Sequence, residues 1–125
     1  MNDVKQSYLF LMYPKCSTCQ KAKRFLDEHN VDYTLRHIVE NPPTAAEMKE
    51  WLNKSDAPLK KLWNTSGQKY RALKLKERIP EMSLEESLEC LASDGMLVKR
   101  PLLIGDDTML IGFKQAEWEK LVNAK

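Results

Sequence analysis

Two cysteines separated by two residues are the side chains of this chain best suited to covalent chemistry. Cys16 and Cys19 lie within the segment YPKCSTCQ, residues 13–20. A cysteine reacts as its thiolate, and a pair at this spacing can close and open a disulfide, which is a two-electron redox change. The same spacing supplies half of a zinc site, and two buried thiols can also be inert. The residues on either side help to decide between a redox pair, a zinc site and inert thiols.

The segments on either side predict a helix that begins at Cys16. Residues 7–13 form an apolar run of strand length. The residues that follow recur at helical spacing: Ala22, Phe25, Leu26 and His29. The first N–H groups of a helix favour an anion, so the pKa of Cys16 is expected to fall, helped by the cationic Lys15. We predict Cys16 as the nucleophile and Cys19, one turn along the helix, as the resolving thiol.

A zinc site would need more ligands than the sequence offers nearby. Structural zinc takes two further ligands at knuckle-like spacing. Only Cys90, His29 and His37 remain, and they are scattered along the chain. Redox chemistry is therefore favoured over structural zinc or inert thiols, and neither a metal nor a cofactor is expected. Cys90 falls within a predicted helix, where a half-buried thiol without a catalytic role is expected.

A second element with chemical potential is the Arg100-Pro101 pair. Proline lacks the N–H of a strand ladder, so directly before an edge-type hairpin it could leave the preceding backbone free for an extended substrate. The Arg100 guanidinium could pair with the Cys16 thiolate or with a bound oxyanion. A solvated Lys99-Arg100 pair is the alternative, and the residues alone slightly favour it. They also favour a trans peptide before Pro101, since only about 5–6% of such bonds are cis.

The predicted elements form an α/β fold in the order β-α-β, helical insertion, β-β-α. The strands are expected at residues 7–13, 31–39, 102–104 and 109–111, the last two joined by a turn at 105–108. The insertion, about residues 44–95, is expected to hold helical segments at about 45–54, 59–63, 70–76 and after Ser83, with capping boxes at Thr44/Glu47 and Ser83/Glu86. Three leucines of the last of these are expected to face inward: Leu84, Leu88 and Leu91. A final helix begins near Lys114, and the whole chain, 1–125, is expected to be one domain with a four-stranded mixed sheet.

Charge and composition exclude several classes of partner. The chain has 125 residues, 42% hydrophobic, with 20 Lys+Arg against 18 Asp+Glu, a formal net charge of +2. Such a small net charge gives no strong field for nucleic acid or an anionic membrane. No run approaches the ~20 apolar residues of a membrane span, and MNDVKQS at the start has no apolar region of a signal peptide. We expect a cytoplasmic protein with reduced or catalytic thiols.

Four separated motifs resemble the arsenate-reductase-like family, which includes glutaredoxin-dependent arsenate reductases, Spx transcription regulators and YusI-type proteins. The motifs are YPKCSTCQKAKRFL, ENPPTAAEMKE, SDGMLVKRPLLI and a GF pair followed by a helix. The resemblance runs from about Tyr8 to Val122 and implies a thioredoxin/glutaredoxin-like core with a helical insertion. It also implies a cis peptide before Pro101, and Cys16 as nucleophile with Arg100 nearby. The residues expected to contact a substrate are Lys15, Ser17, Thr18 and Pro101, and the expected partner is a cellular thiol reductant: thioredoxin, glutaredoxin or a low-molecular-weight thiol.

Departures from the family pattern separate its branches. The arsenate reductases lack the second cysteine and hold the oxyanion with three arginines, of which one matches Arg100 and the others fall at or near Trp63 and near Gly112. One guanidinium cannot replace three without loss of charge-assisted binding. In Spx, the glycine presented to RNA polymerase falls at Pro58, whose ring and fixed φ differ from glycine. KKLWNTSGQKYR and ECLASDGMLVKRP are most similar to the YusI-type branch.

These patterns rank three functions. The first is a thiol–disulfide oxidoreductase of unidentified substrate that uses Cys16 and Cys19. The second is an Spx-like redox-sensing regulator that binds RNA polymerase, and the third is a glutaredoxin-dependent arsenate reductase.

Overall fold

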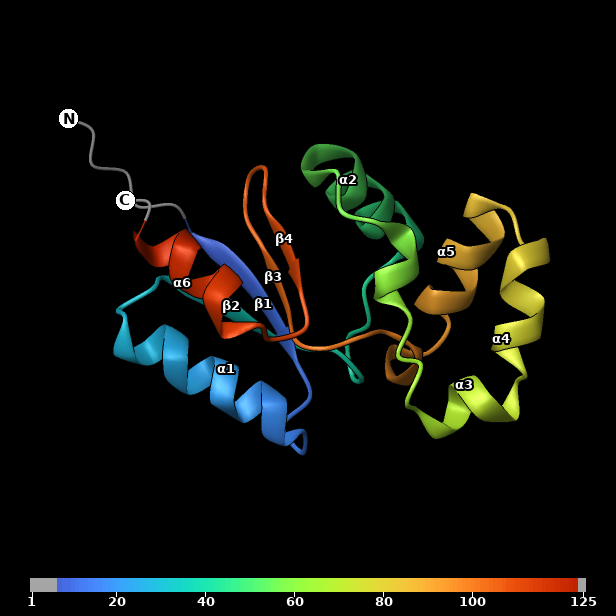
Figure 1. Ribbon diagram of the computed structural model, residues 1–125, viewed down its shortest axis with the longest axis horizontal. Helices are drawn as coiled ribbons and strands as arrows, with labels where there is room; N and C mark the ends of the chain where they lie inside the picture. The colour runs from blue at the N-terminus through green and yellow to red at the C-terminus, as the bar shows by residue number, and fades with distance from the viewer. Residues whose placement is uncertain (1–6, 124–125) are drawn as a thin grey trace.

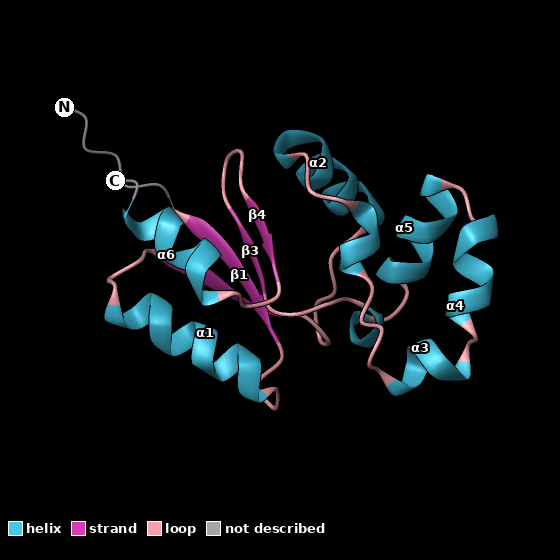
Figure 2. Cartoon of the chain, in the orientation of Figure 1, coloured by secondary structure: helices cyan, strands magenta, loops and turns pink. Residues whose placement is uncertain are grey.

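The computed structural model describes residues 7–123, and its elements confirm the predicted order (Figures 1 and 2). The strands are β1 (Tyr8–Met12), β2 (Tyr33–His37), β3 (Leu102–Ile104) and β4 (Met109–Ile111). The helices are α1 (Ser17–Glu28), α2 (Ala45–Ser55), α3 (Gln68–Ala72), α4 (Leu75–Arg78), α5 (Leu84–Ala92) and α6 (Gln115–Asn123). Short 3₁₀ helices occupy Leu59–Leu62, Ile79–Glu81 and Gly95–Leu97. Most of the N-terminal segment examined for a signal peptide lies outside the described residues.

The sheet has the order β2-β1-β3-β4 and is mixed, as predicted. β1 pairs with β2 in parallel, because α1 carries the chain back over the sheet between them, and β3 pairs antiparallel with both β1 and β4. The hairpin turn is closed by the Gly105 N–H, which donates to the Thr108 carbonyl at 2.8 Å. The expectation of an edge-type hairpin after Pro101 is wrong for β3, which lies between β1 and β4. Pro101 therefore leads into the interior of the sheet.

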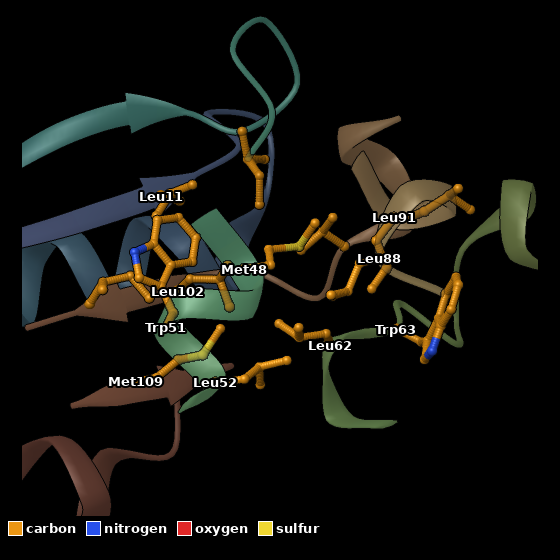
Figure 3. Packing of buried hydrophobic residues seen from close by; sticks show 14 of the residues in the cluster. Leu11, Met48, Trp51, Leu52, Leu62, Trp63, Leu88, Leu91, Leu102 and Met109 are labelled. Carbon is orange, nitrogen blue, oxygen red and sulfur yellow. The ribbon is translucent and has the colours of Figure 1, made fainter. Parts of the chain in front are cut away.

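The two faces of the sheet bury alternate residues of β1 and β3 against different helices. Phe10 and Leu103 pack on one face with α1 and α6, where Trp118 is fully buried. Leu11 and Leu102 pack on the other face with α2 and the rest of the insertion. Figure 3 shows this second cluster, in which Leu11 and Leu102 lie close to Trp51 of α2. This alternation follows from the two-residue period of a strand.

The insertion is built from short, capped helices that share one core with the sheet. Both predicted capping boxes are present, at Thr44/Glu47 and Ser83/Glu86. The expected helix at about 70–76 is divided into α3 and α4, because Lys74 takes a left-handed conformation (φ 54°). Leu84 is 45% exposed, so its expected inward position is wrong, whereas Leu88 and Leu91 are fully buried. Leu84 is the first residue of α5, one turn before the buried Leu88.

An antiparallel bridge returns the insertion to the sheet. Trp63 pairs with Val98, the Asn64 N–H donates to the Leu97 carbonyl at 2.8 Å, and the Lys99 N–H donates to the Leu62 carbonyl at 2.7 Å. Because this bridge and one hydrophobic cluster join the insertion to the sheet, we infer that the chain folds as one domain. No helix among residues 7–123 is long and apolar enough to cross a membrane.

Candidate functional site

Cys16 stands at the end of the turn that joins β1 to α1, as the sequence predicts. It is the N-cap of α1, with extended backbone angles (φ −91°, ψ 119°). Its N–H donates to the Tyr13 carbonyl at 2.9 Å, and its Sγ accepts from the Cys19 N–H at 3.4 Å. A thiol thus takes the place that a serine or aspartate oxygen has in most N-caps. The cap points the sulfur at the unpaired N–H groups of the first helical turn.

The surroundings of Cys16 favour its thiolate. Partial burial by itself raises the pKa of Cys16, but three kinds of neighbour outweigh it. They are hydrogen bonds from the backbone and side chain of Cys19, the positive charge of Arg100, and the Thr18 N–H. The net result is a pKa below the usual range for a cysteine, as expected for a reactive thiol.

Cys19 differs from Cys16 in burial and in the direction of its pKa shift. It is fully buried, and burial is the largest cause that raises its pKa, to about 12. Its Sγ accepts from the Tyr13 N–H at 3.5 Å. The helix face that meets the core runs from Cys19 through Ala22 to Leu26, whereas His29, expected on that face, is exposed. The buried face therefore begins one turn earlier than the spacing predicted, and it includes the second cysteine.

Arg100 lies beside the cysteine turn. Its Cζ lies 5.2 Å from the centroid of the Tyr13 ring, which is cation–π distance, and its charge acts on Cys16. Arg100 Nε and Nη1 are buried, and no group of residues 7–123 accepts a hydrogen bond from them. The slightly favoured interpretation of a solvated Lys99-Arg100 pair is therefore wrong for Arg100. The peptide before Pro101 is cis, as the resemblance implied and contrary to the expectation from the residues alone.

A pocket of about 310 Å³ opens beside Cys16. It is lined by the start of α1, one part of the insertion, the segment before β3, and the end of β4 with the segment that follows: Cys16, Thr18, Asn64, Ser66, Lys99, Arg100, Ile111, Gly112, Phe113 and Lys114. A larger hollow of about 750 Å³ lies over α3 and α4, but no cysteine lines it. The pocket beside Cys16 can therefore bring a substrate to the thiolate.

The predicted substrate contacts take different places around this pocket. Thr18 lines it, whereas Lys15 and Ser17 are exposed on the turn and are not among its lining residues. Pro101 is buried, and its carbonyl accepts from the Gly112 N–H at 2.8 Å. The roles of all four in substrate binding stay predictions.

Sequence reasoning did not single out the rest of the pocket. Two arginines of the arsenate reductases were expected to fall at or near Trp63 and near Gly112. Asn64 directly follows the first of these positions, and Lys114 lies two residues after the second. Trp63 itself is buried, so its neighbour Asn64 takes the place in the pocket. The GF pair before the last helix was the available signal for Gly112 and Phe113.

No metal site competes with this interpretation among residues 7–123. That part of the chain contains no group of three or more His, Cys, Asp or Glu side chains placed to hold a metal ion. All three cysteines are free, with Cys16 and Cys90 half-buried.

The three thiols should differ in reactivity in a single alkylation experiment. With iodoacetamide near pH 7, we expect Cys16 to react about tenfold or more faster than Cys19, because only thiolates react and the pKa values of the two groups shift in opposite directions. Cys90 is the internal control, since it is half-buried and burial raises its pKa. Peptide mass spectrometry gives each rate. Labelling of Cys90 before Cys16 would contradict the proposed thiolate.

Comparison with known proteins relates most of the chain to one protein family. Residues 11–121 match the ArsC family. The uncharacterized protein YusI of Bacillus subtilis (strain 168) is 50% identical over 114 residues, which cover 91% of this chain and 97% of YusI. An ArsC family related protein from Bacteroides fragilis superposes with a TM-score of 0.87 at 52% identity, covering 96% of this chain and 99% of that chain. The expected likeness to the YusI-type branch is confirmed.

Other relatives carry names that state a function. The regulatory protein MgsR of Bacillus subtilis is 31% identical over 122 residues, covering 98% of this chain and 95% of MgsR. Global transcriptional regulators named Spx also match, such as Spx 2 of Bacillus cereus at 29% identity over 107 residues, which cover 86% of this chain and 80% of that regulator. The chain is thus similar to regulators as well as to ArsC-type proteins, which confirms both expected likenesses.

Proposed function

Because the chain belongs to the ArsC family, we propose that it is a thiol–disulfide redox protein in which Cys16 is the nucleophile and Cys19 the resolving thiol. The observation that carries the proposal is the contact between the two cysteines: Cys16 Sγ accepts from the Cys19 N–H at 3.4 Å, at the opening of a pocket. One thiol of the pair is reachable and favoured as thiolate, and the other is buried and neutral. This asymmetry suits a two-step exchange.

The first step forms a mixed disulfide. The Cys16 thiolate attacks one sulfur of an oxidised substrate R–S–S–R, the S–S bond of the substrate breaks, and R–S⁻ leaves with the bonding electrons and takes up a proton. Arg100 stays beside the reacting sulfur and stabilises negative charge there.

The second step closes the protein disulfide. Once Cys16 is bonded to R–S, its negative charge no longer raises the pKa of Cys19, so the Cys19 thiol gives up its proton more readily. The Cys19 sulfur then attacks Cys16 Sγ and releases the second R–S⁻. In sum, the dithiol and R–S–S–R become a Cys16–Cys19 disulfide and two R–SH, with two electrons passed to the substrate.

A cellular thiol returns the protein to its dithiol form. The partner that we propose is a dithiol protein of the thioredoxin or glutaredoxin kind, or a low-molecular-weight thiol, which reverses the same exchange and is itself oxidised. Free cysteines belong in a reducing compartment, so we propose a cytoplasmic location.

A Cys19→Ser variant should accumulate the intermediate of the first step. Incubated with a small disulfide, it is expected to gain the mass of one R–S group on Cys16, because the thiol that would release it is absent. The native chain should instead lose the mass of two hydrogen atoms and carry no adduct at the end of the reaction. Intact-mass spectrometry distinguishes these products. A Cys19→Ser protein that forms no adduct with any small disulfide would count against the proposal.

The second candidate is a redox-sensing regulator that binds RNA polymerase. It is favoured by the 31% identity to the regulatory protein MgsR over 98% of this chain. Pro58, at the position expected to contact polymerase in Spx, is exposed before the first 3₁₀ helix. Retention of polymerase on the immobilised protein, compared between its reduced and oxidised forms, separates the two functions.

Arsenate reduction is the third candidate. The pocket holds two lysines in addition to Arg100, so its positive charge exceeds the single guanidinium that the sequence predicted. Arsenate turnover with glutaredoxin or thioredoxin supplied is the direct assay.

A further inference from the structure

The charged side chains that line the pocket beside Cys16, apart from the thiol itself, are all cations. Three of its lining residues are cations, Lys99, Arg100 and Lys114, and none is an aspartate or glutamate. No carboxylate of residues 7–123 forms an ion pair with any of the three. The chain as a whole carries nearly equal numbers of acidic and basic residues, so this imbalance is local.

The fold places Lys99 over the pocket through its neighbours. The Lys99 N–H donates to the Leu62 carbonyl at 2.7 Å, which fixes its backbone to the insertion. A Cβ on Gly112 would lie 3.2 Å from Lys99 Cε, so the aliphatic stem of the lysine passes directly over this glycine. Gly112 has φ +77°, a conformation that favours glycine, and its carbonyl accepts from Trp118 Nε1 at 3.1 Å. The hydrogen bond from the buried Trp118 therefore fixes the Gly112 backbone, against which the Lys99 side chain packs.

Lys114 stands where helix stability disfavours a cation. It directly precedes α6, and its carbonyl accepts from the Glu117 N–H at 2.9 Å and the Trp118 N–H at 3.2 Å. The N-terminus of a helix carries positive partial charge, so a lysine there gains nothing from the helix dipole. Lys114 instead lines the pocket, where its positive charge adds to the attraction for an anion.

Arg100 supplies the third observation. Its Nε and Nη1 are buried, and no group among residues 7–123 accepts from them. Buried donors are nearly always satisfied, and a guanidinium is best satisfied by an anion. Arg100 lies beside Cys16, where the sulfurs react. The two lysines are therefore free to bind the other parts of a substrate.

We propose that the substrate of this site is a small disulfide that carries carboxylates, and that Lys99 and Lys114 bind those carboxylates while Arg100 faces the reacting sulfurs. This inference rests on the proposed thiol–disulfide function and names its substrate class. The volume of about 310 Å³ is at the lower end of pockets that hold small molecules, which suits one half of a small peptide disulfide. A neutral or cationic disulfide would offer no carboxylate to the two lysines, and a cationic one would be repelled.

Three disulfides of different charge test the proposal: glutathione disulfide, which is anionic, hydroxyethyl disulfide, which is neutral, and cystamine, which is cationic. The rate of Cys16–Cys19 disulfide formation in the full chain is divided, for each probe, by its rate with a free small thiol, so that intrinsic reactivity cancels. We expect the anionic probe to react about tenfold or more faster than the cationic one, with the neutral probe between them and the difference reduced by salt.

Paired variants assign the effect to the two lysines. In Lys99→Gln/Lys114→Gln, the ratio of the anionic to the neutral rate should fall about tenfold. Lys60→Gln/Lys61→Gln removes the same charge from exposed positions outside the pocket and should preserve the ratio. Equal normalised rates for the three probes, or a ratio unchanged in the pocket variant, would overturn the inference while the proposed function stands. No reaction with any probe would instead refute the proposed function.

A competition experiment separates carboxylates from compact oxyanions. S-methylglutathione carries the same carboxylates but cannot react, and it should slow the reaction with glutathione disulfide at lower concentration than inorganic phosphate does. Phosphate that competes as well as S-methylglutathione would show that the cations bind a compact oxyanion, and would overturn the assignment to carboxylates.

Discussion

Replacement of Cys16 by serine is expected to lower the rate of reaction with small disulfides about a thousandfold or more. A serine hydroxyl keeps its proton at neutral pH, and the site offers no base to remove it, because its charged side chains are Lys99, Arg100 and Lys114. The cap geometry should survive, since serine is a good N-cap residue and can accept the Cys19 N–H that Cys16 Sγ now accepts. The variant therefore removes the nucleophile while it preserves the fold.

Cys19 cannot take over in this variant. Loss of the Cys16 charge removes one cause that raises the pKa of Cys19, but burial, the largest cause, remains. Cys19 has no exposed surface, so a disulfide cannot reach its sulfur without local opening of α1. The residual rate should be no greater than that of the half-buried Cys90.

The measurement is the rate of adduct or disulfide formation with hydroxyethyl disulfide, followed by intact-mass spectrometry. Cys90→Ser is the matched control, because it exchanges the same atoms on α5, outside the pocket, and should react at the native rate. A Cys16→Ser protein that retained a tenth of the native rate would show that another thiol is the nucleophile.

The sequence indicated the reactive half of the site because that half is local. An apolar strand, a four-residue turn and a helical repeat follow one another directly, so the position of Cys16 at a helix start could be predicted from spacing alone. The two capping boxes could be predicted for the same reason. Thr44 with Glu47, and Ser83 with Glu86, exchange side-chain-to-backbone hydrogen bonds within one helical turn.

The other half of the pocket depends on contacts between distant segments. Asn64 and Lys99 reach it because the Trp63–Val98 bridge closes the insertion, and Lys114 reaches it because α6 packs on the sheet. Periodicity predicts that a helix has a buried face but not where that face begins, which is why His29 and Leu84 were placed inward although both are exposed. Tertiary contacts, absent from local patterns, decide such positions.

The largest effect on stability is expected from Gly95→Ala, which should reduce the free energy of unfolding by about 3 kcal/mol or more. An alanine Cβ at this position would overlap the Ile38 carbonyl oxygen and lie 2.9 Å from Val39 Cα, and both are backbone atoms. They cannot give way easily, because the Ile38 N–H donates to the Met12 carbonyl at 2.9 Å and the Ile38 side chain is fully buried. Relief of the clash requires the 3₁₀ helix at Gly95–Leu97 to move away from the end of β2.

Gly67→Ala is the matched control for this clash. Its Cβ would lie 2.8 Å from Asn64 Nδ2, the mobile end of a side chain, so the cost is a shift of that amide and of its hydrogen bond to the Met96 carbonyl, about 1 kcal/mol. Urea unfolding of both variants measures the difference, and failure of Gly95→Ala to fold at all is the extreme of the expected result. Equal urea midpoints of unfolding for the two variants would contradict the prediction, because they would show that the backbone around Gly95 moves easily to accommodate a Cβ. In that case the close backbone contact would not be what fixes the 3₁₀ helix at Gly95–Leu97 against the end of β2.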